Sequence, residues 1–376
     1  MSAPAFGRFF LPGLSEVHPT VLEAMNKPMI PHRGQEMVEL LRRLDSRLRQ
    51  LFCTKRHVLL GTCTATAFME MAVRSGVKAR ALCLVGGAYG ERFAAITESV
   101  GKDVVRLNVP WGRTIEPDML ADALKRSPVD AVTVVHSETS TGALAPLEDL
   151  AAVVGEHDDI LLLVDGVTSV GASPVETDAW NLDFVFTGSN GPLALPPGMA
   201  LAAASERMCQ RAKSIPERGA CLDLVAFQEA ADAFQPTYTP AIPLLFGLDR
   251  QLLRIEDAGG VAVRLDRHCA IRSSVERWEQ LVGNGMGFGF LPEVDRRSSA
   301  VSCLKVPSGT NARRLVKELE IRGFYVGSGY GKLKRETLRI GHMGDHTVDE
   351  TDALLQGLVA VVSGAEAERS HSRGEV

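Results

Sequence analysis

The sequence has no apolar run that approaches the roughly 20 residues of a transmembrane helix, and its net charge is only −5. The first feature argues against a membrane span. The second argues against nucleic acid or an anionic membrane surface as the main partner. The start, Met1-Ser-Ala-Pro, has neither the basic nor the apolar part of a signal peptide. We therefore expect a cytoplasmic protein.

The sequence also lacks paired cysteines. Its seven cysteines are scattered between Cys53 and Cys303, are odd in number and show no C-x-x-C spacing. We therefore expect reduced thiols and neither a disulfide framework nor a metal site. The content of 45% hydrophobic and 23% charged residues is that of an ordinary globular protein. A chain of 376 residues is long enough to divide into two domains.

What the sequence does contain is an aliphatic run, Leu161–Val164, that ends in Asp165 and small residues. A fully buried parallel strand has this pattern when it delivers one polar group at its carboxyl end, where ligands of open α/β sheets bind. A second strand, Phe184–Phe186, leads into the small polar turn Thr187–Pro192. A carboxylate and such a turn suggest a cofactor site, because a pyridinium nitrogen needs an anion and a phosphate needs short polar donors. The alternative for Asp165 is a helix N-cap.

A further candidate for anion binding follows the predicted strand Val58–Leu60. The turn Gly61–Ala67 is rich in small residues, and we expect a helix from about Phe68. Free backbone N–H groups and the helix dipole would then point at an anion beside Thr64–Thr66. An ordinary turn between a strand and a helix would have the same sequence.

Two more strand ends carry polar or aromatic residues. Cys83–Val85 is followed by a glycine-rich turn that contains Tyr89, whose rigid face suits stacking on a pyridine ring. Alternatively, Tyr89 packs between neighbouring residues at the protein surface. Val132–Val135 is followed by His136–Gly142, which includes Thr139.

Periodicity predicts the other elements. Residues 6–20 are punctuated by proline and glycine and should be irregular. We expect helices over 21–25, 36–51, 116–125, 205–235, 242–255, 261–282 and 309–322, and strands near 104–107, 199–203, 287–291, 300–306, 324–326 and 337–340.

The segment VDGVTSVGASPVETDAWNLDFVFTGSNGPLALPPGMA resembles the core of class V aminotransferases of the alanine/serine–glyoxylate group, which use pyridoxal phosphate (PLP). Further matching motifs follow in order between about residue 8 and residue 362. The resemblance implies an α/β protein with the PLP-dependent transferase (aspartate aminotransferase-like) fold, in which a large domain has a mostly parallel sheet and a smaller C-terminal domain is α+β. We divide the chain into an N-terminal arm (1–20), a large cofactor-binding domain (21–255), a small domain (256–364) and a disordered tail (365–376).

The resemblance also implies roles for individual residues. Asp165 would pair with the ring nitrogen of the cofactor, Tyr89 would lie on the ring face, and the hydroxyl of Thr139 would bond a group attached to the ring. The other cofactor contacts that it implies are Thr64, Ala65, Thr66, Val167, Ser189 and Asn190.

Two C-terminal motifs complete the implied site. Gln235–Pro240 resembles the family's Y-T-P segment, which would present Tyr238 and Thr239 to the cofactor phosphate of a second subunit in a homodimer. The aliphatic run 241–248 would be costly to expose and favours the same dimer. Arg339 lies in a match to R-I-G-H-M-G and would clamp the carboxylate of an amino or keto acid with two parallel hydrogen bonds. Its alternative is a surface ion pair.

One position departs from the family pattern. The lysine to which the family attaches its cofactor falls on Gly191, which has no amine. Pro192 beside it lacks an N–H and can reshape the turn. Lys332 and Lys334 do not replace the lysine, because the family carries them together with its own.

Three functions therefore remain open. The chain binds PLP or pyridoxamine phosphate (PMP) without a covalent link, or it is a PLP-independent enzyme that reuses the cleft on an amino-acid-like or keto-acid substrate, or it is a catalytically inactive homologue. Retention of Asp165, Tyr89 and Arg339 favours the first, since an inactive protein has no physical need for a carboxylate at a ring nitrogen. The second is the main alternative, because the turn at Thr64–Thr66 would also hold another phosphate or carboxylate.

Overall fold

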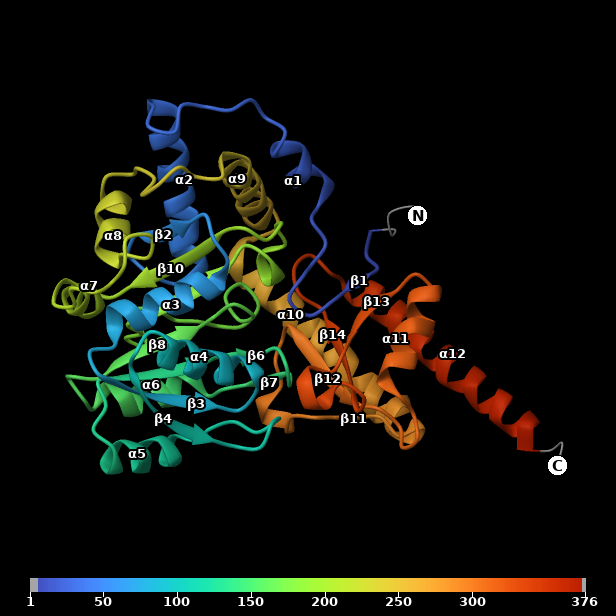
Figure 1. The fold of residues 1–376 in the computed structure, drawn as a ribbon. Helices are drawn as coiled ribbons and strands as arrows, with labels where there is room; N and C mark the ends of the chain where they lie inside the picture. The colour runs from blue at the N-terminus through green and yellow to red at the C-terminus, as the bar shows by residue number, and fades with distance from the viewer. Residues whose placement is uncertain (1–5, 374–376) are drawn as a thin grey trace.

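A computed structural model of the protein describes residues 6–373, with side chains as far as residue 364. Its helices and strands form two neighbouring layered units, one around a seven-stranded sheet and one around a five-stranded sheet (Figure 1). The N-terminal segment and helix α12 both lie with the smaller unit (Figure 1).

The seven-stranded sheet is mostly parallel, as predicted. Its strand order is β2-β10-β9-β8-β5-β3-β4, and only β10 runs antiparallel to its neighbours, β2 and β9. Each residue of β5, β8 and β9 is buried, because helices cover both faces of the sheet. The strands are β2 (Val58–Gly61), β3 (Arg80–Val85), β4 (Asp103–Asn108), β5 (Ala131–Val135), β8 (Leu161–Asp165), β9 (Phe184–Gly188) and β10 (Ala200–Ala204).

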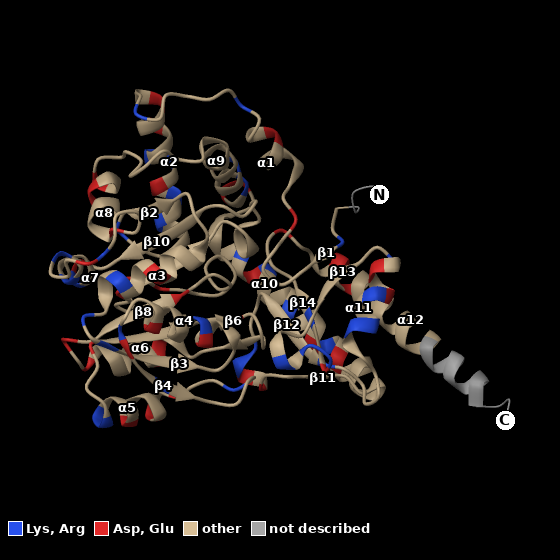
Figure 2. Cartoon of the chain, viewed as in Figure 1, with Lys and Arg blue, Asp and Glu red and all other residues tan. Residues whose placement is uncertain are grey.

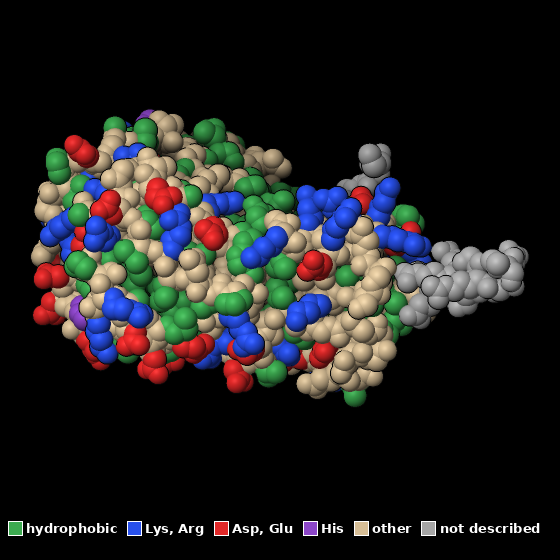
Figure 3. Space-filling model, turned by 60° about the horizontal axis from the view of Figure 1, so that its bottom comes forward, with side chains coloured by type: hydrophobic (Ala, Val, Ile, Leu, Met, Phe, Trp, Pro, Cys, Tyr) green, Lys and Arg blue, Asp and Glu red, His purple; other side chains and the backbone are tan. Residues whose placement is uncertain are grey.

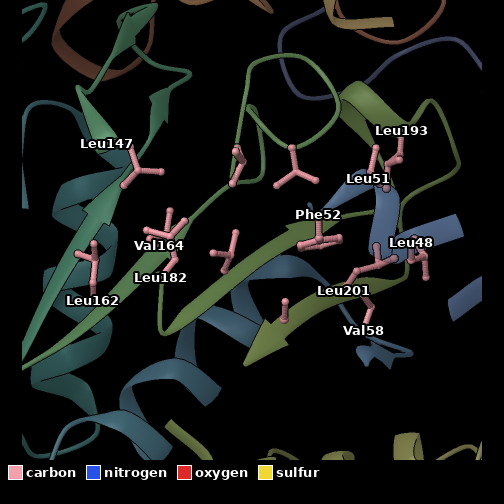
Figure 4. Close-up of a cluster of buried hydrophobic side chains, with 14 of the residues drawn as sticks. Leu48, Leu51, Phe52, Val58, Leu147, Leu162, Val164, Leu182, Leu193 and Leu201 are labelled. Carbon is pink, nitrogen blue, oxygen red and sulfur yellow. The ribbon is translucent and has the colours of Figure 1, made fainter. Parts of the chain in front are cut away.

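The two faces of this sheet bury separate hydrophobic cores. Figure 4 shows part of the first core, where Leu48 and Leu51 of α2 lie near Leu201 of β10. The helices of this face are α2 (Gln35–Leu51), α5 (Pro117–Arg126), α6 (Leu147–Gly155) and α9 (Ile242–Asp257). Those of the opposite face are α3 (Ala65–Gly76), α4 (Ala88–Ser99), α7 (Glu206–Lys213) and α8 (Leu224–Asp232).

The five-stranded sheet, called the small sheet below, has the order β1-β13-β14-β12-β11. Helices α10, α11 and α12 pack with it over a third hydrophobic core. Its elements are β1 (Phe9–Phe10), α10 (Gly260–Trp278), β11 (Gly289–Phe290), β12 (Val301–Lys305), α11 (Ala312–Ile321), β13 (Tyr325–Ser328), β14 (Thr337–Gly341) and α12 (Val348–Arg373). Helix α1 (Pro19–Ala24) and the hairpin β6 (Ser137–Glu138) and β7 (Ala143–Leu144) complete the elements named below.

The break between α9 and α10 lies at a pair of glycines, between the helices predicted over 242–255 and 261–282. Gly259 and Gly260 have φ values of +105° and +85°, which disfavour other residues and end one helix before the next begins. The division of the chain into domains near residue 255 stays a prediction.

The N-terminal arm differs from the prediction of an irregular segment. Phe9 and Phe10 form β1, which pairs in parallel with Tyr325 and Val326 of β13. The ring of Phe10 is fully buried and stacks on His346 with centroids 4.1 Å apart. The arm becomes a strand because an open sheet edge supplies backbone partners and a core supplies a place for one aromatic side chain.

Two other predictions need correction. Helix α3 begins at Ala65 and not near Phe68, because Thr64 already has extended N-cap geometry. The predicted helix over 205–235 is divided into α7 and α8 by a segment that contains Pro216 and Gly219, whose φ is +80°.

A further prediction concerns the end of the chain. Helix α12 ends at Arg373, and the disorder that we predict for the tail from residue 365 stays a prediction. Residues 374–376 lie outside the described residues.

Charged residues lie mainly on helices and loops, away from the central strands (Figure 2). On the face shown in Figure 3, side chains of both signs are interspersed. Over residues 6–373 no helix is both long and apolar enough to cross a membrane.

The arm provides a stability test. Phe10→Ala should lower the free energy of unfolding by about 3–5 kcal/mol, because a fully buried aromatic ring leaves a cavity. Phe9→Ala is the matched control and should cost about 1 kcal/mol, since Phe9 is only half-buried. Urea denaturation followed by circular dichroism measures both, and equal losses would show that β1 does not anchor the arm.

Candidate active site

A cavity with about 790 Å³ of empty space, part of it open to solvent, lies where β5, β8 and β9 end. This is the carboxyl edge of the parallel strands, where α/β sheets bind ligands. Its wall is formed by Gly13, Thr64, Ala65, Thr66, Met69, Tyr89, Arg92, Val135, Ser137, Thr139, Asp165, Val167, Thr168, Phe186, Asn190 and Pro197. Most of the predicted cofactor contacts thus meet in one cavity, although they come from separate parts of the sequence.

Asp165 is the last residue of β8, and its side chain reaches the cavity wall. The residue is 3% exposed. Its Oδ1 accepts a hydrogen bond of 2.9 Å from the N–H of Val167, and no other side-chain bond to it is found among the described residues. Burial raises the pKa of Asp165 to about 7, and the negative charge of Glu138 adds to the effect, while Val167 and Arg92 oppose it. No helix begins here, so Asp165 is not a helix N-cap.

The N-terminus of α3 forms another part of the wall. The hydroxyl of Thr64 does not cap the helix. In the described part of the chain, the N–H groups of Ala65 and Thr66 have no acceptor. Unused N–H donors at the positive end of a helix suit a phosphate or a carboxylate.

Tyr89 is held in place by a buried carboxylate. Its N–H and that of Gly90 donate to Glu138, each at 3.1 Å. Glu138 is 5% exposed and also accepts the hydroxyl of Ser140 at 2.6 Å. A Cβ atom at Gly87 would lie 2.4 Å from the carboxyl carbon of Glu138, so glycine permits this approach. Glu138 carries no separate signal in the sequence, although it lies within the His136–Gly142 motif.

Thr139 joins the cavity to the small sheet. Its hydroxyl bonds that of Thr168 at 2.6 Å, and both residues are buried. Its carbonyl oxygen accepts a hydrogen bond of 3.1 Å from Nη1 of Arg339. Thr168 lies in the cavity wall, and the sequence did not single it out.

Arg339 lies on β14, next to the cavity wall. It is 8% exposed, and its Nε donates to the carbonyl oxygen of Ser328 at 3.0 Å. Burial lowers the pKa of its guanidinium. Among residues 6–364 it forms no ion pair with a carboxylate, so the alternative of a surface ion pair does not apply.

The turn after β9 divides the predicted contacts. Asn190 lies in the cavity wall and donates through Nδ2 to the carbonyl oxygen of Gly13. Ser189 faces away: its hydroxyl donates to the carbonyl oxygen of Pro196 at 2.7 Å and accepts the N–H of Met199 at 3.2 Å.

Gly191 begins a short 3-10 turn and has a φ of +74°, a conformation that favours glycine. A Cβ atom there would lie 3.2 Å from Sδ of Met343. The hydroxyl of Ser15 donates to the carbonyl oxygen of Gly191, and the guanidinium of Arg264 donates to that of Pro192. The N-terminal arm and α10 thus hold this turn from two sides.

Tyr238 and Thr239 lie outside the cavity of their own chain. Tyr238 is 46% exposed, and its hydroxyl donates to the carbonyl oxygen of Ala220. The aliphatic run that follows is mostly buried inside the chain, with Ile242 and Leu245 at 3% and Leu248 at 0% exposure. That run therefore does not require a second subunit to cover it.

Comparison with known proteins agrees with this architecture. The family model for aminotransferase class V matches residues 30–335. An uncharacterized aminotransferase of Methanocaldococcus jannaschii is 34% identical over 347 residues, which cover 89% of this chain and 87% of the relative. A serine–glyoxylate aminotransferase of Methylorubrum extorquens is 27% identical over 359 residues, 91% of this chain and 87% of the relative.

The crystal structure of an alanine–glyoxylate aminotransferase from Nostoc sp. superposes with a TM-score of 0.88 at 28% identity, and the match covers 96% of each chain. The fold is therefore that of PLP-dependent aminotransferases, as the sequence predicts. With this match over most of its length, the chain belongs to the class V aminotransferase family and is an aminotransferase-like enzyme.

Proposed function

We propose that this enzyme holds PLP or PMP without a covalent bond and acts on a small amino or keto acid. The observation that carries the proposal is Asp165, a buried carboxylate in the cavity wall with no cationic partner in hydrogen-bond contact among the described residues. A buried charge of this kind needs a compensating cation. A protonated pyridine nitrogen supplies one and, when bound, draws electrons from the reacting carbon.

The other wall residues fit the rest of such a group. The hydroxyl of Thr64 and the N–H groups of Ala65 and Thr66 would hold its phosphate, with Asn190 beside them. Tyr89 and Val167 would lie against the ring.

The remaining polar contacts complete the assignment. Thr139 would bond an oxygen on the ring, and Arg339 would hold the substrate carboxylate. Ser189 supports the turn from behind through Pro196 and Met199 and would not contact the group itself.

The non-covalent mode rests on the lack of an amine. Within the described residues the cavity wall contains no lysine. Lys332 and Lys334 are exposed, and the amine of Lys332 lies 4.5 Å from the centre of the Trp111 ring. We assign proton transfer to Tyr89 in the cavity wall and to water. Burial raises the pKa of Tyr89, so its hydroxyl keeps its proton at neutral pH and acts as a donor.

We further propose a cytoplasmic homodimer. Tyr238 and Thr239 are exposed and separate from their own cavity, which fits a role in the site of a second subunit. An apolar groove lies beside them, lined in part by Leu41, Leu60 and Phe234. The free state of all seven cysteines agrees with a reducing compartment.

The dimer is tested by sedimentation. The protein should sediment as a dimer at micromolar concentration, and Leu60→Glu in the groove should produce monomers, because a charge would be buried at the interface. Lys334→Glu, an exposed position outside the groove, is the control and should leave the dimer intact. A parent protein that sediments as a stable monomer would refute this part of the proposal.

The absence of a covalent bond is tested by reduction. PLP added to the protein should shift its absorbance, yet borohydride should leave the protein mass unchanged, because reduction fixes only a carbon–nitrogen bond to an amine. Gly191→Lys should gain the mass of reduced cofactor, since its neighbour Asn190 lies in the cavity wall, where the aldehyde would be held, and the thioether of Met343 can move aside for the new side chain. The positive φ should also cost this variant roughly 1–2 kcal/mol of stability.

Gly309→Lys is the matched control, because Gly309 has a similar φ of +77° but lies in open space. It should gain no mass after reduction. If neither the parent nor Gly191→Lys binds PLP, the proposed cofactor is wrong. The protein is then a PLP-independent enzyme or a catalytically inactive homologue.

Asp165 gives a pH-dependent prediction. The carboxyl group binds its proton more tightly in the folded chain, with a pKa of about 7 against an ordinary value of 3.8. Its contribution to folding therefore weakens as pH rises from 3.8 to about 7 and is constant above that. An asparagine cannot ionise, so Asp165→Asn does not lose stability in this way. From pH 5 to pH 8 the variant should therefore gain stability relative to the parent. It should also bind PLP more weakly.

Urea denaturation of the ligand-free proteins at the two pH values measures the difference. Asp122→Asn, at an exposed aspartate of α5, is the control and should show no such trend. A pH-independent difference for Asp165→Asn would show that Asp165 is ionised without penalty in the free protein.

A further inference from the structure

Two arginines lie at the side of the cavity that faces the small sheet. Arg339 is buried on β14, and Arg92 is half-buried on α4 and forms part of the cavity wall. Neither forms an ion pair with a carboxylate of residues 6–364. By contrast, Arg106 on the neighbouring strand binds Glu98 at 2.6 Å.

The position of Arg92 is fixed by two tyrosines. Its guanidinium carbon lies 4.7 Å from the centre of the Tyr89 ring, and Nη2 donates to the hydroxyl of Tyr330 at 3.4 Å. The guanidinium carbon of Arg339 lies 5.6 Å from the Tyr330 ring. Tyr330 therefore lies between two guanidinium groups, and each retains donors that no carboxylate occupies.

The two buried carboxylates that interact electrostatically with these arginines, Asp165 with Arg92 and Glu138 with Arg339, are already engaged. Glu138 accepts the N–H groups of Tyr89, Gly90 and Ser140 and so holds the start of α4. Asp165 is the partner of the ring in the proposed function. Two cations beside a partly desolvated cavity therefore call for anions from the ligand.

We propose that the substrate carries two anionic groups, of which Arg339 binds the α-carboxylate and Arg92 binds a second on the substrate side chain. The hydroxyl of Tyr330 assists Arg92. The second group is a carboxylate or a phosphate, since a guanidinium forms paired hydrogen bonds with either. The inference rests on the proposed function for the role of Arg339, and it narrows the substrate to an amino or keto acid whose side chain carries a carboxylate or a phosphate.

The direction of the Arg92 side chain argues against the cofactor phosphate as its partner. The contact of Arg92 with Tyr330 directs it toward the loop after β13, whereas the unused N–H groups of Ala65 and Thr66 lie on α3. Lys332, two residues after Tyr330, adds another positive charge on the Tyr330 side.

Calorimetric titration with unreactive analogues tests this inference. Succinate carries two carboxylates, butyrate has the same chain length with one, and 3-phosphonopropionate replaces one carboxylate by a phosphonate. The parent should bind succinate or phosphonopropionate at least about tenfold more tightly than butyrate. The tighter of the two identifies the second group as carboxylate or phosphate.

Variants assign the preference to its residue. Arg92→Met should remove the preference and leave butyrate binding unchanged, Arg92→Lys should retain part of it, and Tyr330→Phe should reduce it. Arg8→Met is the matched control, because the Arg8 guanidinium also lies over an aromatic ring, 4.3 Å from the centre of Phe324, away from the cavity wall. It should leave the preference intact.

The titrations are repeated with and without added PLP, so that the two proposals can fail separately. Lack of PLP binding would refute the proposed cofactor, while a preference for two anions that disappears in Arg92→Met would still support this inference. Equal binding of the three analogues by the parent would overturn it. So would an Arg92→Met protein that binds PLP more weakly but keeps its preference.

Discussion

The burial of one carboxylate is the constraint on which the site depends. Asp165 ends a strand that is buried along its whole length, and its neighbours in the sheet are Val135 and Phe186. Helices cover both faces of the sheet and leave Asp165 3% exposed, so its charged form is destabilised unless a cation lies beside it. The cavity exists at this edge because parallel strands end together and leave room that their crossover helices do not fill.

A second buried carboxylate organises the wall around the first. Glu138 accepts N–H donors from the start of α4 and thereby fixes Tyr89, and the same helix carries Arg92 one turn later. The wall beside the small sheet depends on Thr139, whose carbonyl oxygen holds Arg339. Side chains from both sheets are thus linked through a few hydrogen bonds, and a shift of either sheet would alter the distance between Arg92 and Arg339.

Much of this arrangement could be predicted from the sequence, for identifiable reasons. The strand that ends in Asp165 and the helix that follows Thr64 have short-range patterns that periodicity and turn residues reveal. The pairing of β1 with β13 could not be predicted, because a two-residue strand is decided by the distant edge that it meets. The orientation of Ser189 away from the cavity likewise depends on Pro196 and Met199, which only the folded turn brings within reach.

The turn at Gly191 is built as a unit around glycine. Its positive φ, the close thioether of Met343 and the hydrogen bond from Ser15 all involve the same residue. If a lysine were replaced by glycine and the turn stayed otherwise unchanged, a cavity the size of the lysine side chain would remain. Such a cavity in a closely packed interior lowers the stability of the fold. Here Met343 stands where a Cβ atom would point, and Arg264 holds the next carbonyl group. The surrounding residues therefore fit a chain in which this position has no side chain.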